Sequence, residues 1–172
     1  MVKFIHAADV HLGITYAGVG KNHKDIAREL KQVAFDAFER VIDTAIEEEV
    51  DALVLAGDLL DSSRTFVKEK CFLQSQLNRL APFGIPVVVA LGNHDAGSAY
   101  VSGKHIYTFG SDVETIELET RNGERVAFSG FSYEVPVVAT RKVQEYPLKS
   151  ANCDVHIGVL HGELTTSEGR YA

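Results

Sequence analysis

Four short apolar runs in this chain are each followed by side chains that can bind metal ions. The runs and the residues after them are Phe4-Ile5 before Asp9 and His11, Ala52–Ala56 before Asp58, Val87–Leu91 before Asn93 and His94, and Ile157–Leu160 before His161. Apolar runs of this length, bounded by chain breakers, are typical of buried strands in an α/β sheet. Ligands in such sheets bind at the carboxyl ends of the strands, so we expect these polar side chains to converge on one edge. Their nitrogen and oxygen donors suit two divalent metal ions, and such a pair favours hydrolysis of a phosphate ester.

The motifs of the first half are weak when each is taken alone. Asp9 and His11 are two residues apart, so on extended backbone their side chains point the same way and can bind one ion. Asp58 follows Gly57, which permits a tight turn, and its two carboxylate oxygens can bridge two cations. In isolation, Asp58 could equally cap the next helix, and Asp-x-His is a common surface pair. We expect Asp61 to lie behind the metal ligands or near the substrate.

The segment Gly92-Asn93-His94-Asp95 is the most specific of the four motifs. Asn93 offers a neutral amide oxygen as a ligand, and His94 can donate a proton to the leaving oxygen or stabilise charge in the transition state. Asp95 can hold the His94 ring in the right tautomer, so we predict both as catalytic residues. His161 would bind the second metal, although a lone histidine at a strand end is more often structural. No catalytic role is expected for the remaining histidines, His6, His23, His105 and His156.

Two helices and a hairpin are predicted between these runs. Helices over 25–49 and 67–80 follow from apolar residues at three- and four-residue steps. The predicted apolar face of the first helix is Ile26, Leu30, Val33, Ala37, Phe38, Val41, Ala45 and Ile46. Residues 113–120 and 124–130 alternate around Asn122-Gly123, which is a strong hairpin signal, whereas 95–109 has no clear period. Alternating strands and helices with right-handed crossovers predict one α/β domain over residues 1–172, with a mostly parallel central sheet flanked by helices.

Composition excludes several classes of protein. The net charge is −7, which argues against a protein that grips nucleic acid through a broad basic surface. No apolar stretch approaches the roughly 20 residues that span a bilayer. The first residues run directly into a strand without a signal-peptide pattern, so a cytoplasmic location and no membrane partner are expected. Cys71 and Cys153 form no metal-spaced pair and are expected to be reduced and structural.

Taken in order, the four motifs resemble the calcineurin-like metallophosphoesterases. The stretches FIHAADVHLG, VDALVLAGDLLDSS and GIPVVVALGNHD are closest to the SbcD-like DNA repair exonucleases. The resemblance implies a layered metallophosphoesterase fold and two-metal activation of water on a DNA phosphodiester, usually with manganese. It implies that Asp9 and His11 bind the first metal, Asp58 bridges both, Asn93 and His161 bind the second, and His94 is the catalytic histidine. The implied partners are DNA, a coiled-coil ATPase subunit and a second copy of the chain.

One departure from this family concerns the ligand set. The family carries a further Gly-His-x-His motif after the position of His161, and a capping region that helps to hold DNA. Neither is present in these 172 residues. We therefore expect the N-terminal part of a longer nuclease, with a fold incomplete at the C-terminus, weakened metal affinity and low activity. Two alternatives stay open: a phosphodiesterase or phosphatase acting on nucleotides or other small phosphate esters, and a noncatalytic interaction scaffold.

Overall fold

Strand β2 (Ala52–Ala56) is buried along its whole length, as are all residues of β3 (Val87–Ala90). Continuous burial requires cover on both faces of a sheet, which is the usual setting of parallel strands. The computed structural model describes residues 1–14, 24–61, 67–97 and 101–162. Within them the four-stranded sheet has the order β1-β2-β3-β4, with all neighbours parallel. The α/β class and the parallel central sheet are therefore confirmed.

The outer strands of this sheet differ in how well the sequence predicted them. Strand β1 (Phe4–Ala7) is where the first apolar run predicts it. Strand β4 (Ile106–Thr108) lies in the stretch for which no element was predicted. It has only three residues, and two of them are exposed, so it carries no apolar run or alternation for a sequence pattern to detect.

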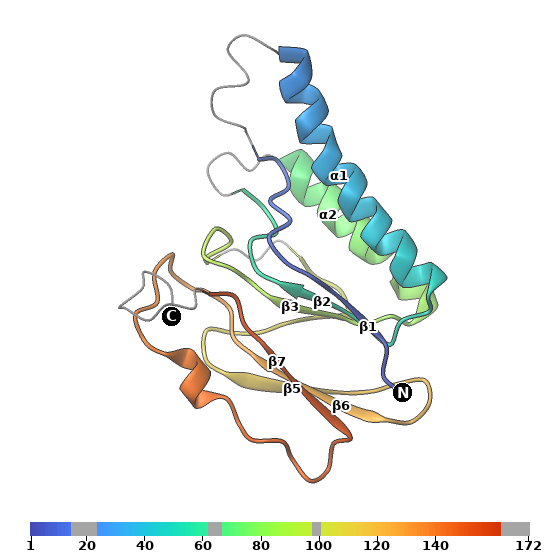
Figure 1. Cartoon of the computed structure of the whole chain (residues 1–172), viewed down its shortest axis with the longest axis vertical. Coiled ribbons are helices and arrows are strands. Elements are labelled where there is room, and N and C mark those ends of the chain that lie inside the picture. Colours follow the sequence, from blue (N-terminus) through green and yellow to red (C-terminus); the bar gives the residue numbers. More distant parts are fainter. Residues whose placement is uncertain (15–23, 62–66, 98–100, 163–172) are drawn as a thin grey trace.

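Helices α1 (Lys24–Glu47) and α2 (Val67–Asn78) lie together on one side of this sheet (Figure 1). In α2, Leu73 and Leu77 are fully buried, and a short 3-10 helix, η2 (Ala81–Phe83), follows. The predicted face of α1 is partly wrong: Ile26, Val33 and Ala37 are exposed. The rest of that face is largely confirmed, since Phe38 and Ala45 lie in the core with Val41 and Ile46 packed against it. Phe35 and Ile42, which were not predicted, lie in the core as well. Among the described residues, no helix is long and apolar enough to cross a membrane.

The other side of the parallel sheet is covered by a second sheet of order β5-β6-β7 (Figure 1). Strands β5 (Glu114–Glu119) and β6 (Arg125–Gly130) form the predicted antiparallel hairpin, with Gly123 at φ 79° in its turn. Strand β7 (Val155–Val159) pairs with β6 in parallel, after a connection that holds the 3-10 helix η3 (Lys142–Glu145). The fourth apolar run was expected to join the same sheet as the other three, and it lies in the second sheet instead.

Alternation along β2 explains how the two sheets and the helices share one core. Leu53 and Leu55 pack among the residues of α1 and α2. Val54 and Ala56 face the other way and pack against residues of the second sheet such as Phe128. The two cores place the end of β7 beside the ends of the parallel strands, which is the arrangement on which the candidate site depends.

Candidate metal and active site

Three of the predicted ligands have left-handed backbone. The φ angles of Asp9, His11 and Asp58 are 53°, 46° and 51°, a region that non-glycine residues rarely adopt. Hydrogen bonds between the loops after β1 and β2 hold these conformations. The amide of Asp9 donates to the Gly57 carbonyl at 3.1 Å, and the amide of His11 donates to the Asp58 carbonyl at 2.9 Å. Such backbone persists where the surrounding structure fixes it, and it clusters at functional sites.

The carboxylate of Asp58 lies at the centre of the group. Its Oδ1 accepts the backbone N–H of His94 at 3.0 Å, so that oxygen is already engaged. Its Oδ2 lies 3.7 Å from Nε2 of His11 and 3.5 Å from Nε2 of His161. Asp58 is 5% exposed. One oxygen of a buried carboxylate therefore lies between two imidazoles that come from different sheets.

His161 presents Nε2 to the site because its Nδ1 is hydrogen-bonded to the backbone of β2. Nδ1 lies 3.2 Å from the Ala56 carbonyl oxygen, which can only accept, so Nδ1 donates. Nε2 lies 3.1 Å from Oδ1 of Asn93 as well as near Asp58. A second hydrogen bond of this kind orients histidines that bind metals. The hydrogen bond with Asp58 raises the pKa of His161, against burial, which lowers it.

The pKa of Asp58 is lowered, although burial alone would raise it. The hydrogen bond with His161, the amide of His94 and the positive charges of both rings outweigh that burial. Oxygens of Asp58 and Asn93 thus face a ring nitrogen of His161, and these lone pairs repel one another unless a proton or a cation lies among them. This donor set fits a divalent cation.

Two glycines permit this close packing. A Cβ atom at Gly57, which has φ 81°, would lie 2.1 Å from Nδ1 of His161. A Cβ atom at Gly92 would lie 2.2 Å from Oδ1 of Asp58. Both distances are far below van der Waals contact, so neither position has room for a side chain.

The five predicted ligands are joined by one series of contacts. Oδ1 of Asp9 lies 3.8 Å from Nε2 of His11, and the series continues through Asp58 and His161 to Asn93. One ligand atom each from Asp9, Asp58 and His161 lie within 4.8 Å of one another. The side chain of Asp9 is 63% exposed, so the group opens to solvent on that side. Oxygen and imidazole donors in such proximity suit a divalent metal centre.

His94 lies beside this group with a different partner from the expected one. Its ring packs edge-on against the ring of His11, with centroids 5.2 Å apart. Nδ1 of His94 is buried without a hydrogen-bond partner in the described part of the chain, and Oδ1 of Asp61 lies 3.9 Å away. The expectation that Asp95 holds this ring is therefore corrected. Both oxygens of Asp95 accept backbone N–H groups of Leu59, Leu60 and Gly92 instead.

The other singled-out residues lie apart from the group or outside the described residues. His105 bonds the Leu77 carbonyl, and His156 bonds Ser129 on β6. His6 lies exposed on β1, whereas His23 falls outside the described ranges. One neighbour was missed: the buried Tyr133 ring packs edge-on against His161 at 6.0 Å. It comes from the irregular segment after β6, where no pattern in the sequence indicates a contact.

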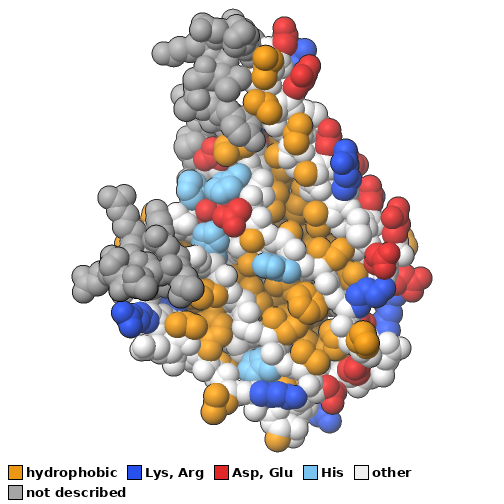
Figure 2. Space-filling model, in the orientation of Figure 1, with side chains coloured by type: hydrophobic (Ala, Val, Ile, Leu, Met, Phe, Trp, Pro, Cys, Tyr) orange, Lys and Arg blue, Asp and Glu red, His pale blue; other side chains and the backbone are white. Residues whose placement is uncertain are grey.

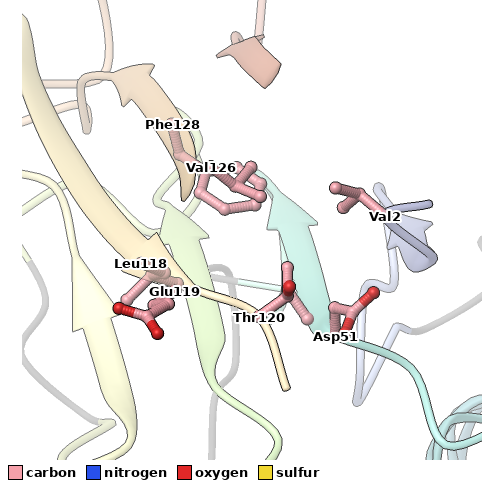
Figure 3. A pocket seen from close by; sticks show the side chains of 8 residues that line it. Val2, Asp51, Leu118, Glu119, Thr120, Val126 and Phe128 are labelled. Carbon is pink, nitrogen blue, oxygen red and sulfur yellow. The ribbon is translucent and has the colours of Figure 1, made fainter. Parts of the chain in front are cut away.

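Histidine and acidic side chains gather at one place on the visible surface, near the ends of the parallel strands (Figure 2). The small cavity drawn in Figure 3 is elsewhere, between the sheets at the amino end of β2, beside Val2 and Phe128. Its volume of about 10 Å³ has room for about one water molecule. It is therefore too small for a substrate.

Comparison with known proteins assigns a family to this geometry. The family model described as calcineurin-like phosphoesterase matches residues 2–170. The chain belongs to that family. Members are metallophosphoesterases that use divalent metal ions, so the resemblance drawn from the four motifs is confirmed.

Relatives cover nearly all of this chain but extend well beyond its length. The metallophosphoesterase YhaO of Bacillus subtilis is 36% identical over 98% of the chain, which corresponds to 42% of YhaO. The DNA double-strand break repair protein Mre11 of Haloferax volcanii is 32% identical over 96% of the chain and 35% of that protein. A dimetal phosphatase of Danio rerio has a TM-score of 0.43 at 18% identity, with 74% of this chain and 43% of the phosphatase covered, which is too distant to carry an argument. The chain thus spans less than half of each relative.

Proposed function

We propose that this chain is a metal-dependent phosphodiester hydrolase that acts on DNA as an exonuclease. The observation that carries the proposal is the position of Asp58, whose Oδ2 lies between His11 and His161 at 3.7 and 3.5 Å. A carboxylate oxygen shared by two imidazoles suits a pair of divalent ions bridged by one ligand.

Each of the five ligands has a proposed role. Asp9 and His11 hold one ion, Asn93 and His161 hold the other, and Asp58 binds both. When bound, the two ions activate water and neutralise charge on the phosphate in hydrolysis. Manganese is the proposed metal, since family resemblance favours it.

His94 is proposed to act on the substrate itself. Its ring is 40% exposed beside the ligands, so it can reach a phosphate ester bound there. Oδ1 of Asp61 lies 3.9 Å from Nδ1 of His94, and the ring can hydrogen-bond a phosphate oxygen or give a proton to the leaving oxygen. Asp95 has no proposed contact with substrate.

DNA is the proposed substrate because relatives of this chain include DNA double-strand break repair proteins. By the same resemblance, we propose a coiled-coil ATPase partner and a homodimer. A cytoplasmic location is proposed separately, from the pattern of the first residues. A phosphodiesterase for small esters is the second candidate, because the same ligands would serve either substrate. The name of the relative YhaO, a metallophosphoesterase, mentions no DNA, which leaves room for this second candidate.

The test is hydrolysis by this chain at saturating Mn²⁺ of three substrates: linear double-stranded DNA, a nucleotide cyclic diester and a nitrophenyl diester. His94→Gln is compared with His6→Gln, which changes an exposed histidine of β1 outside the ligand group. We expect the chain to release nucleotides slowly from DNA ends when Mn²⁺ is present. This activity should be absent in His94→Gln and unchanged in His6→Gln.

Other outcomes would replace the proposal. Cleavage of small diesters with intact DNA would favour the second candidate. Mn²⁺ binding without hydrolysis of any ester would favour a noncatalytic scaffold. Equal activity of His94→Gln and His6→Gln would remove His94 from the mechanism.

A further inference from the structure

Asp95 is a buried carboxylate whose two oxygens accept backbone N–H groups from two loops. It lies on the loop after β3 and is 1% exposed. Its Oδ2 accepts N–H groups of Leu59 at 3.1 Å and Gly92 at 3.0 Å, and its Oδ1 accepts that of Leu60 at 3.1 Å. An ionised carboxylate has about four lone-pair sites, so it can accept all three bonds at once. Hydrogen bonds to a charged acceptor are roughly twice as strong as those between neutral groups.

The loops after β2 and β3 are joined by reciprocal hydrogen bonds, in which an aspartate of each loop accepts backbone N–H groups of the other. Asp95, from the second loop, bonds the backbone of the first at Leu59 and Leu60. Asp58, from the first loop, accepts the amide of His94 in the second. The backbone ladder between the strands continues as far as the bond from the Gly57 amide to the Ala90 carbonyl, at 2.8 Å. Past that bond, the two carboxylates connect the loops.

These hydrogen bonds between the loops also explain how Asp58 keeps an unfavourable backbone conformation. Asp58 has φ 51°, and Leu59 and Leu60 follow it directly. Fixing the amides of these two residues fixes the direction in which the chain leaves Asp58. Strained backbone persists only where its surroundings determine it, and Asp95 supplies part of that determination.

We propose that Asp95 is a positioning residue, which sets the separation between Asp58 and the pair Asn93 and His94 before any metal binds. This role rests on the proposed function insofar as Asp58 and Asn93 are taken as metal ligands. Asp95 acts through the backbone of both loops and touches neither ion nor substrate. An asparagine cannot replace it, because the amide nitrogen of asparagine donates and would face a backbone N–H.

The first test reads the backbone directly, by NMR on this chain without metal. In the unmutated chain we expect slow exchange of the amides of Leu59, Leu60 and Gly92, with couplings across the hydrogen bonds to the Asp95 carboxylate carbon. In Asp95→Asn we expect exchange at these amides to be at least about tenfold faster. Absent couplings, or unchanged exchange in the variant, would overturn the proposal.

The matched control removes a comparable hydrogen bond far from the site. Thr120 is buried in the hairpin, and its Oγ1 accepts the backbone N–H of Glu124 at 3.0 Å. We expect Thr120→Ala to speed exchange at Glu124 and leave the amides of Leu59, Leu60 and Gly92 unchanged. A general loosening by Thr120→Ala equal to that of Asp95→Asn would show that Asp95 serves stability alone.

The second test measures Mn²⁺ affinity by calorimetry in the same proteins. Substitution of a residue that orients metal ligands typically lowers metal affinity by about 10–100-fold, and this loss is expected for Asp95→Asn. Thr120→Ala should bind as the unmutated chain does. Asp95→Glu keeps the charge and should recover part of the affinity. Affinity unchanged in Asp95→Asn would overturn the proposal.

The two tests separate this proposal from the proposed function. The amide measurements need neither metal nor substrate, so they report on Asp95 even if no ester is cleaved. Should Asp95→Asn fail to fold, the couplings in the unmutated chain and the Mn²⁺ affinity of Asp95→Glu relative to the unmutated chain still test the proposal.

Discussion

At the scale of single residues, strain and ligand chemistry coincide. Asp9, His11 and Asp58 are proposed ligands, and all three have φ near 50°. Left-handed backbone costs about 1–2 kcal/mol per non-glycine residue, so three such residues in adjacent loops are a substantial cost to stability. Their side chains could have reached the same edge on relaxed backbone with less precision. The cost is understandable if the positions of the ligand atoms matter for function.

Gly92→Ala tests this precision sterically. The new Cβ would lie 2.2 Å from Oδ1 and 2.5 Å from the backbone nitrogen of Asp58, so Asp58 must move. We expect Mn²⁺ affinity, measured by calorimetry, to fall at least about tenfold. Unfolding by urea should show a loss of about 1–3 kcal/mol, typical of overpacking.

Gly110→Ala is the control, since the nearest atom to its added Cβ, Oε1 of Glu114, is 3.5 Å away. It should bind Mn²⁺ as the unmutated chain does. Binding by Gly92→Ala at full affinity would mean that the position of Asp58 is not set by this contact.

The pH dependence of metal binding follows from His161. Its hydrogen bond with Asp58 raises its pKa above 6.5, while metal binding requires the neutral ring. A proton therefore competes with the metal, and affinity should weaken as pH falls from 8 to 6, by up to about tenfold per pH unit per proton. Mn²⁺ titrations at several pH values check this, and a constant affinity over that range would contradict it.

The stability of the metal-free chain should depend on pH with the opposite sign, so that it is greater at low pH. A raised pKa means that the folded state binds the proton more tightly than the unfolded state. This contribution to stability is fully present below pH 6.5 and is lost as pH rises through the folded pKa. His161→Gln should remove it, together with most of the pH dependence of metal binding.

At the scale of elements, periodicity predicted those with strong patterns. The helices and the β5–β6 hairpin repeat their apolar residues regularly, so their positions were predicted closely. Strand β4 was missed because it has three residues without a pattern. The sheet to which β7 belongs could not be predicted either, because an apolar run is equally suited to any buried sheet.

In the candidate site, too, some features could be predicted from the sequence and others could not. The types and order of the ligands are visible in the sequence, because each follows an apolar run. The partners of Asp95 were not predictable, since its bonds go to backbone N–H groups that every residue carries. In α1, Val33 and Phe35 are both apolar, and only packing against α2 and the sheet decides that Phe35 is buried.

The end of α1 offers a prediction about stability. Glu49 follows the helix with φ 47°, a position where glycine is preferred because it has no Cβ. We expect Glu49→Gly to raise the free energy of unfolding by about 0.5–1 kcal/mol, measured with urea. The lost ion pair between Glu49 and Arg121 is exposed and worth little.

Glu47→Gly is the matched control, because Glu47 is the last residue of α1. There glycine should destabilise the protein by about 0.5–1 kcal/mol. Equal effects of the two changes would show that the backbone of Glu49 does not limit stability.

At the scale of the whole molecule, the site joins two sheets. Asp9, Asp58 and Asn93 follow strands of the parallel sheet, whereas His161 follows β7 of the second sheet. The apolar layer between the sheets, including Val54 and Phe128, therefore sets the distance between the two groups of ligands. Metal binding should stabilise the packing of one sheet on the other.

The net charge of this chain bears on the proposed binding of DNA. A protein with net charge −7 gains little from the long-range attraction that basic proteins have for phosphates. Its attraction should come instead from divalent ions, which add about four positive charges where the phosphate lies. We expect fluorescence anisotropy to show weak binding of double-stranded DNA with Mn²⁺ and none with EDTA. Between 50 and 200 mM salt, log affinity should fall against log salt with a slope of only about −1 to −3, equivalent to few phosphate contacts. Tight binding in EDTA, or a steep slope, would shift DNA recognition away from the metal site.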